Sequence, residues 1–218
     1  MGRKITAIEV QKKKPHRRSI YLDDRFFVGV DEEIFIKHNL RVGTELSDKE
    51  INQLLYEAEF SFIKEKALHF IKFRERSRKE VLDKLKREKF DRSLIEDVIS
   101  FLEERDIIND ERFAYLFAKD RVKRRGIGLI LLKKEMFQKG LSAELIEITT
   151  KKIYEEFDQR KLIRAHLKRK MSSISSLPPP RAKKRVIDML YRRGFSWDLI
   201  EEALNSINFR SEEAQSSE

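Results

Sequence analysis

The four histidines are the side chains of this sequence best suited to acid–base catalysis or metal binding, and they are His16, His38, His69 and His166. They lie far apart, with no HExxH motif and no pair four residues apart that one helix face would bring together. The chain has no cysteine, which excludes thiolate chemistry, disulfides and cysteine-based zinc sites. We therefore expect no metal, no cofactor and no catalytic residue, and we expect that the protein is not an enzyme.

Two other short patterns have structural explanations. The carboxylate pair Asp23-Asp24 fits a turn, and Glu32-Glu33 fits a helix start, where the helix dipole favours negative charge. The segment Arg125-Gly126-Ile127-Gly128 is too short to predict phosphate binding, and neither GxxxxGK[ST] nor GxGxxG occurs. A hydrolase would lack any candidate nucleophile.

Positive charge is the most informative chemical feature of the sequence. Lys and Arg number 48 against 38 Asp and Glu, which gives a net charge of +10. Such an excess favours nucleic acid, an anionic membrane or an acidic protein surface as partner. The sequence has no window of about 18 apolar residues, the length that crosses a bilayer. The N-terminus lacks the apolar region of a signal peptide. We expect a cytoplasmic protein with no membrane partner.

The positive charge gathers in three runs, at residues 119–125, 160–170 and 181–193. One explanation is that these runs are solvated helix faces, with opposite charges paired between neighbouring helices. The other is that they follow a phosphate backbone or an acidic groove. The cations that we expect to contact a partner are Lys119, Arg121, Lys123, Arg124, Arg125, Lys168, Arg169, Lys170, Arg181, Lys183, Lys184, Arg185, Arg192 and Arg193.

The first 46 residues differ from the rest of the chain. Runs rich in β-branched and aromatic residues at 4–11, 19–23 and 26–30 predict a small antiparallel sheet or hairpin. A basic loop at 12–18 separates the first two runs. Asp31 can then cap a short helix that extends to about His38. We expect residues 1–46 to form an N-terminal β segment with a short helix.

One helix–loop–helix pattern recurs three times after this segment. The stretches 88–102, 139–153 and 193–207 align, with Phe90, Leu141 and Phe195 standing 51 and 54 residues apart. Each has a polar N-cap, and each has the apolar pair around the cap that makes a hydrophobic staple. The caps are Asp91, Ser142 and Ser196, and the staples are Phe90 with Ile95, Leu141 with Ile146 and Phe195 with Ile200. Gly140 and Gly194 end the preceding helix in two copies, where the first copy has Lys89.

Another helix precedes each pair of helices joined in this way. The repeating unit is therefore three helices, arranged in tandem. Ser47 with Glu50 and Ser77 with Glu80 form capping boxes, and Asn109 caps a further helix. The predicted fold is mostly α, an elongated curved array of three-helix repeats with a small N-terminal β-hairpin or sheet. The predicted divisions are a connecting helix and repeat 1 at 47–107, repeat 2 at 108–157, repeat 3 at 158–209 with a Ser/Pro surface loop at 171–180, and a disordered acidic tail at 210–218.

Two stretches resemble a known family. They are RSRKEVLDKLKREKFDRSLIEDVISFLEERDIINDERFA at 76–114 and RRGFSWDLIEEAL at 192–204. The stretch from Asn109 to Ala114, followed by Phe117 and Arg121, looks like the central signature of that family. From about Ala67 to Ile207 the chain resembles the RecX family of recombination regulators, and its N-terminal segment looks like the longer version of the family.

The resemblance implies a partner and a role. The protein would bind the helical filament that RecA recombinase forms on single-stranded DNA, lodge in its groove and modulate it, in most cases by inhibition. Strand exchange, ATP hydrolysis and co-protease activity would fall. The expected partners are the RecA filament and single-stranded DNA, with duplex DNA as a further partner, and the protein is expected to be a monomer. The family offers no catalytic residues that could be assigned to positions of this sequence.

A helix-turn-helix protein that binds DNA directly is the alternative, because two helices joined by a glycine-containing turn fit that motif. The helices after the joints are acidic, however, and an acidic helix suits base recognition poorly. For the filament-binding function, the sequence predicts that replacing Arg124 and Arg125 together by alanine weakens inhibition and leaves helicity unchanged.

Overall fold

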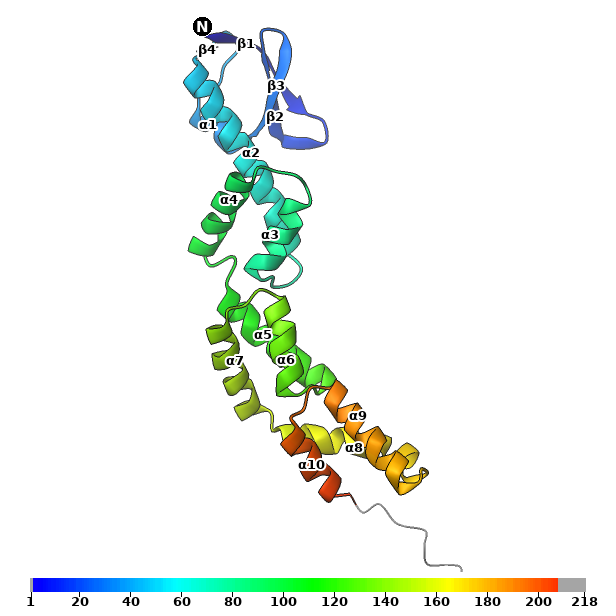
Figure 1. Cartoon of the computed structure of the whole chain (residues 1–218). Helices are drawn as coiled ribbons and strands as arrows, with labels where there is room; N and C mark the ends of the chain where they lie inside the picture. Colours follow the sequence, from blue (N-terminus) through cyan, green and yellow to red (C-terminus); the bar gives the residue numbers. More distant parts are fainter. Residues whose placement is uncertain (1, 208–218) are drawn as a thin grey trace, which may run out of the picture. The chain divides into compact units, whose positions relative to one another are not determined.

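The computed structural model describes residues 2–207 and contains, within them, four strands and ten helices (Figure 1). The chain divides into two compact units, one made of residues 2–75 and 81–108 and the other of residues 76–80 and 109–207. The predicted acidic tail at 210–218 lies outside the described residues.

The first unit begins with an antiparallel sheet of strand order β3-β2-β1-β4. Its strands are β1 (Arg3–Gln11), β2 (Lys14–Leu22), β3 (Arg25–Asp31) and β4 (Glu45–Leu46). The prediction of a loop at 12–18 was wrong, because β2 already starts at Lys14. Gln11 pairs with Lys14 and Val10 with Arg18 across an irregularity in register. Pairing with β1 satisfies the backbone of this basic segment, while its charged side chains stay at the surface.

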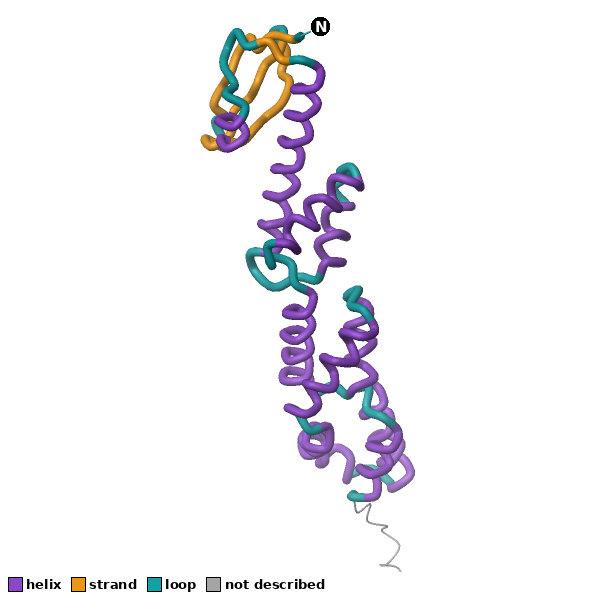
Figure 2. The backbone as a smooth tube through the Cα atoms, turned by 90° about the vertical axis from the view of Figure 1, so that its left-hand side faces the viewer, coloured by secondary structure: helices purple, strands orange, loops and turns teal. Residues whose placement is uncertain are grey.

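Two helices complete the N-terminal part of this unit. The short α1 (Glu32–Lys37) is capped by Asp31, whose side chain accepts a hydrogen bond from the Ile34 amide, as predicted. The long α2 (Asp48–Ile71) begins with the predicted capping box between Ser47 and Glu50. Its first half packs on the sheet, with Leu54 and Ala58 in the same buried cluster as Ile20 and Val30. Figure 2 shows the second half of α2 continuing past the sheet to the next helices.

The remaining helices form three-helix repeats, which confirms the predicted fold class. The second half of α2 joins α3 (Arg78–Lys86) and α4 (Arg92–Glu104). The next group is α5 (Asp110–Arg125), α6 (Leu129–Gln138) and α7 (Ala143–Glu156), and the last is α8 (Gln159–Ser175), α9 (Pro179–Arg192) and α10 (Trp197–Asn205). Each of these groups encloses its own cluster of buried apolar side chains.

The joints between the second and third helices have the predicted backbone. Gly140 and Gly194 take φ values of 82° and 78°, which favour glycine, and the next amide donates back to a carbonyl five residues earlier in both copies. Lys89 occupies the same left-handed region at φ 62°, where a Cβ atom causes strain. Ser142 caps α7 through its hydroxyl, whereas Ser196 stands at the N-cap of α10 without a side-chain hydrogen bond.

The predicted surface loop at 171–180 is helical over most of its length. Helix α8 extends through Ser175, and α9 begins at Pro179, so the link is only Ser176–Pro178. Ile174 is the physical reason, because it is buried in the third repeat's core and its packing outweighs the weak helix propensity of the serines around it. Proline at the first helical position costs no hydrogen bond, so the Pro run can open α9.

Candidate functional site

The basic run on α5 is largely neutralised by carboxylates of the neighbouring helices. Lys119 pairs with Glu156 of α7 at 2.7 Å, and its ammonium also donates to the Tyr115 hydroxyl at 3.1 Å. These two hydrogen bonds raise the pKa of Lys119. The prediction of paired charges between neighbouring helices is therefore correct for this side chain.

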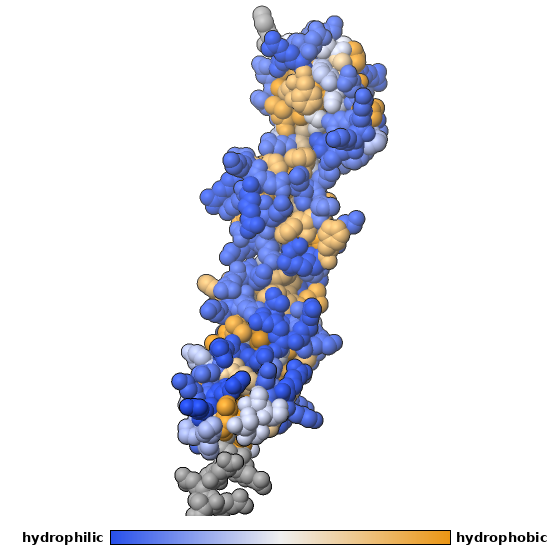
Figure 3. Space-filling model, turned by 90° about the vertical axis from the view of Figure 1, so that its right-hand side faces the viewer, coloured by the Kyte–Doolittle hydropathy of each residue, from blue (hydrophilic) through white to orange (hydrophobic). Residues whose placement is uncertain are grey.

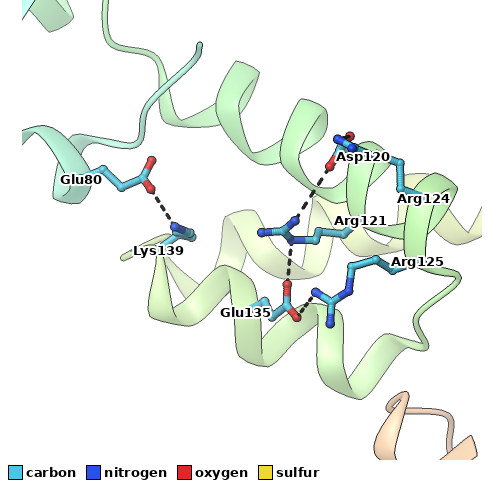
Figure 4. A network of polar contacts seen from close by, with 7 residues as sticks. All are labelled: Glu80, Asp120, Arg121, Arg124, Arg125, Glu135 and Lys139. Atoms are coloured by element: carbon cyan, nitrogen blue, oxygen red, sulfur yellow. Dashed lines mark hydrogen bonds and ion pairs between the residues drawn. The ribbon is translucent and has the colours of Figure 1, made fainter. Parts of the chain in front are cut away.

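Glu135 of α6 holds two more cations of the same run (Figure 4). Its carboxylate lies 2.9 Å from Arg121 Nε and accepts a hydrogen bond from Arg125 Nη1 at 2.7 Å. The Glu135 side chain is only 17% exposed, so this carboxylate is largely shielded from solvent. The Arg121 guanidinium also lies over the Phe117 ring, 4.7 Å from its centroid. Arg121 and Arg125 are thus fixed within the repeat.

Two cations of this run extend further into solvent. Lys123 is exposed, and the Arg124 side chain is 76% exposed and lies 3.3 Å from Asp120 one turn earlier. An exposed pair at this spacing stabilises a helix by only about 0.3–0.5 kcal/mol. Arg124 can therefore leave Asp120 for a phosphate at little cost.

Helices α8 and α9 of the third repeat carry a large excess of positive charge. Residues 159–193 contain twelve Lys and Arg and a single acidic residue, Asp188. We define the third-repeat basic surface as the seven exposed cations at residues 168–170 of α8 and 181–185 of α9. They are Lys168, Arg169, Lys170, Arg181, Lys183, Lys184 and Arg185. These helices carry too few carboxylates to neutralise this surface, in contrast to the arrangement on α5.

The last two predicted cations lie where α9 ends. Arg192 is exposed, and its Nε donates to the Asp188 carbonyl at 3.0 Å. Arg193 is half-buried, and its Nη1 donates to the Arg125 carbonyl at 2.8 Å. Burial lowers the pKa of Arg193, and the positive charges of Arg125 and Arg169 lower it further.

Two aromatic side chains are exposed at the same end of the repeat. Tyr191 on α9 is 70% exposed and Trp197 on α10 is 56% exposed. By contrast, Phe113 is buried in the second repeat's core. Figure 3 shows a mostly hydrophilic face with small, separate hydrophobic areas.

A close contact joins the α5–α6 loop to the third repeat, and sequence reasoning missed it. The Gly128 amide donates to the Arg193 carbonyl at 2.8 Å, and the Ile130 amide donates to the Gly194 carbonyl at 3.0 Å. His166 of α8 is buried, and its Nε2 donates to the Gly126 carbonyl at 2.7 Å. The glycines of the Arg125–Gly128 segment therefore allow this close backbone contact. We call the contact between residues 126–130 and residues 166, 193 and 194 the 128/194 junction.

The first turn of α3, which belongs to the second unit, meets the earlier joint in the same way. The Ser77 hydroxyl donates to the Lys139 carbonyl at 2.8 Å, and the Lys139 ammonium pairs with Glu80 at 2.7 Å. Gly140 lies against the Lys79 side chain. In the second unit, the start of α3 thus contacts the joint at Gly140, and the start of α6 contacts the joint at Gly194.

Comparison with known proteins gives the family. Residues 3–47 match the regulatory protein RecX N-terminal domain, and residues 64–102, 109–149 and 158–204 match the first, second and third three-helix domains of RecX. The chain belongs to the RecX family. Regulatory protein RecX of Bacillus subtilis (strain 168) is 32% identical over 209 residues, which cover 96% of this chain and 79% of that protein. Regulatory protein RecX of Staphylococcus aureus (strain Newman) is 26% identical over 97% of this chain and 77% of its own length.

Two solved structures share the fold. A crystal structure of regulatory protein RecX has a TM-score of 0.75 and 23% identity, covering 93% of this chain and 99% of that one. The structure of RecX from Lactobacillus salivarius has a TM-score of 0.62 and 23% identity, covering 68% and 98%. The RecX relatives are described as regulatory proteins, which agrees with the expectation that the chain is not an enzyme. Within residues 2–207 no helix could cross a membrane and no cluster of metal-binding side chains occurs.

Proposed function

We propose that this protein binds the filament that RecA recombinase forms on single-stranded DNA, lies in its helical groove and lowers its strand-exchange, ATPase and co-protease activities. Membership of the RecX family across nearly the whole chain is the observation that carries this proposal. The protein acts as a monomer, and tandem repeats let it contact several filament subunits, so that weak contacts add through effective concentration.

The third-repeat basic surface is the main contact surface in this proposal. Its cations are exposed on helices that carry one acidic residue, so the carboxylates of these two helices compete little with a phosphate for them. Lys119, Arg121 and Arg125 differ, because each is held by a carboxylate of its own repeat. Lys123 and Arg124 extend the contact surface onto α5.

Direct recognition of duplex DNA by a helix after a joint is less well supported. Helix α10 presents Asp198, Glu201 and Glu202 at its surface. These carboxylates would be repelled by the phosphates that line a groove. The basic residues lie instead on the helices before the joint.

The experiment compares two variants that each lose three positive charges. One carries Arg181→Ala, Lys184→Ala and Arg185→Ala on α9. The matched control carries Lys49→Ala, Lys86→Ala and Lys151→Ala, three exposed cations on separate helices. The readout is the concentration that halves DNA-dependent ATP hydrolysis by RecA, with helicity checked by circular dichroism.

We expect the α9 variant to need roughly tenfold more protein than the wild type, because it loses up to three phosphate contacts. The control should change little. Equal inhibition by the α9 variant and the wild type would contradict the assignment of this surface. Absence of inhibition or of filament binding by the wild type itself would contradict the proposed function.

A further inference from the structure

We propose that the 128/194 junction carries a binding site for a single phosphate group, formed by the guanidinium groups of Arg125, Arg169 and Arg193. The proposal rests on the proposed function, because a nucleic-acid backbone is the main source of such a group there. It assigns to three of the predicted cations a shared task that their positions in the sequence do not reveal.

Backbone contacts bring two of the three arginines together. Arg193 donates through Nη1 to the carbonyl of Arg125, and its own carbonyl accepts from Gly128, so α9 is tied to the α5–α6 loop at two points. The Arg125 guanidinium donates to Glu135 at 2.7 Å. Both side chains are therefore positioned before any ligand arrives, which lowers the entropy cost of binding.

Helix α8 adds the third arginine. His166 is anchored to the Gly126 carbonyl at 2.7 Å, and Arg169 lies one turn further along the same helix. Residues three apart lie on one helix face, so Arg169 faces the junction from the side that His166 occupies. A Cβ atom on Gly126 would come within 2.6 Å of the His166 ring, which shows how closely α8 approaches this loop.

Charge at the junction is unbalanced. In the part of the chain that the structure describes, Glu135 is the carboxylate paired with this group, and it also pairs with Arg121. Burial lowers the pKa of His166, and although its hydrogen bond to Gly126 acts in the opposite direction, Arg193 and Arg169 lower it further. The imidazole is thus held neutral beside the arginines. A phosphate would relieve the mutual repulsion of the guanidinium groups and match their planar, forked donors.

Occupation of the site has a mechanical consequence. A phosphate there would bridge Arg125 of the second repeat to Arg169 and Arg193 of the third. Contact with the backbone of a nucleic acid would therefore stiffen the joint between these two repeats. The same binding event would raise the pKa of His166, because it places negative charge near the imidazole.

The test uses the full chain without recombinase and follows the ring resonances of His166 by NMR, assigned through a His166→Gln variant. One arm adds inorganic phosphate against chloride at equal ionic strength. The other adds a short oligothymidylate. A raised pKa of His166 with both probes would identify a site for phosphate in general, and a raised pKa with the oligonucleotide alone would identify a site for a backbone phosphate.

Binding to the oligonucleotide across a salt series gives the second readout. Arg169→Ala should make the slope of the logarithm of the binding constant against the logarithm of salt concentration shallower by roughly 0.7, the value for one phosphate contact on a single strand. Lys161→Ala is the matched control, because it removes the same charge from an exposed position two turns earlier in α8. Arg193→Lys should retain the charge but lose affinity, since lysine lacks the forked donor.

The proposal is overturned if neither probe changes the pKa of His166 and if Arg169→Ala weakens binding no more than Lys161→Ala. Because recombinase is absent, that outcome would leave the filament-binding proposal standing. Failure of filament binding by the wild type would, in turn, leave the phosphate site to be judged on its own results.

Discussion

The backbones of Gly128 and Gly194 are in contact, so close that a Cβ atom on Gly128 would come within 2.4 Å of the Gly194 carbonyl oxygen. The same oxygen accepts a hydrogen bond from the Ile130 amide at 3.0 Å. The glycine-containing joint of the third repeat therefore serves two purposes. It turns the chain between α9 and α10, and it receives the loop that starts α6.

Gly128→Ala should destabilise the protein. Gly128 has no positive φ, so the cost comes from the clash with backbone atoms of Gly194, which cannot move aside as a side chain can. Overpacking of this kind costs about 1–3 kcal/mol, and urea denaturation would measure it. In the control Gly29→Ala, the new Cβ meets only the flexible ends of the Gln11 and Arg17 side chains. Equal stability of the two variants would contradict the close contact.

Lys89→Gly should stabilise the first repeat. Lys89 has φ 62°, a region where a Cβ atom costs about 1–2 kcal/mol. Glycine removes this strain but loses more backbone entropy on folding, so the net gain in the free energy of unfolding should be on the order of 1 kcal/mol. Lys86→Gly at the end of α3 replaces the same residue type in a right-handed helix and should destabilise. A loss of stability in Lys89→Gly would show that the joint is not strained.

The stability of the protein should fall as the pH is lowered below about 6.5. Burial lowers the pKa of folded His166 below its ordinary value of 6.5, so the unfolded chain binds more protons in this range. Stability therefore increases with pH through this window and is lost as the pH falls through it. His166→Gln keeps an N–H donor near the Gly126 carbonyl but cannot be protonated. Chemical denaturation at pH 7.5 and pH 5.5 should show a smaller difference for the variant, and an equal difference would contradict this role of His166.

Glu135→Gln should strengthen binding to single-stranded DNA. The variant removes the negative charge that Arg121 and Arg125 share, so both guanidinium groups interact more strongly with phosphates. The slope of the logarithm of the binding constant against the logarithm of salt concentration should steepen by up to roughly 1.4, which corresponds to two phosphate contacts. Glu147→Gln removes an equal charge from an exposed carboxylate paired with Lys133 and should have less effect. Unchanged affinity in Glu135→Gln would show that the α5 cations do not face the nucleic acid.

Local signals account for most of the fold that could be predicted from the sequence. A capping box such as Ser47 with Glu50 lies within four residues, and the glycines at 140 and 194 report a backbone conformation that few other residues adopt. The three joints therefore stand out in the sequence itself. The helix over 171–175 does not, because it depends on burial of Ile174 against residues that are distant in the chain.

For the candidate site, the sequence predicted which residues are basic but not which of them are paired. The basic runs are visible in the sequence, but the pairing of Arg121 and Arg125 with Glu135 depends on how α5 and α6 pack. His166 could not be distinguished from an ordinary surface histidine, since its partner Gly126 lies 40 residues away. The structure therefore separates cations that pair with carboxylates of their own repeat from the exposed cations of α8 and α9.

The most direct test of the proposed function compares binding of the wild-type protein to bare single-stranded DNA with binding to a preformed RecA–DNA filament, across a salt series. We expect tighter and less salt-sensitive binding to the filament, because protein contacts in the groove would add to the phosphate contacts made by the third-repeat basic surface. Equal or weaker binding to the filament, with a steep salt dependence of roughly −0.7 per phosphate contacted, would contradict the account and leave only a general nucleic-acid-binding protein.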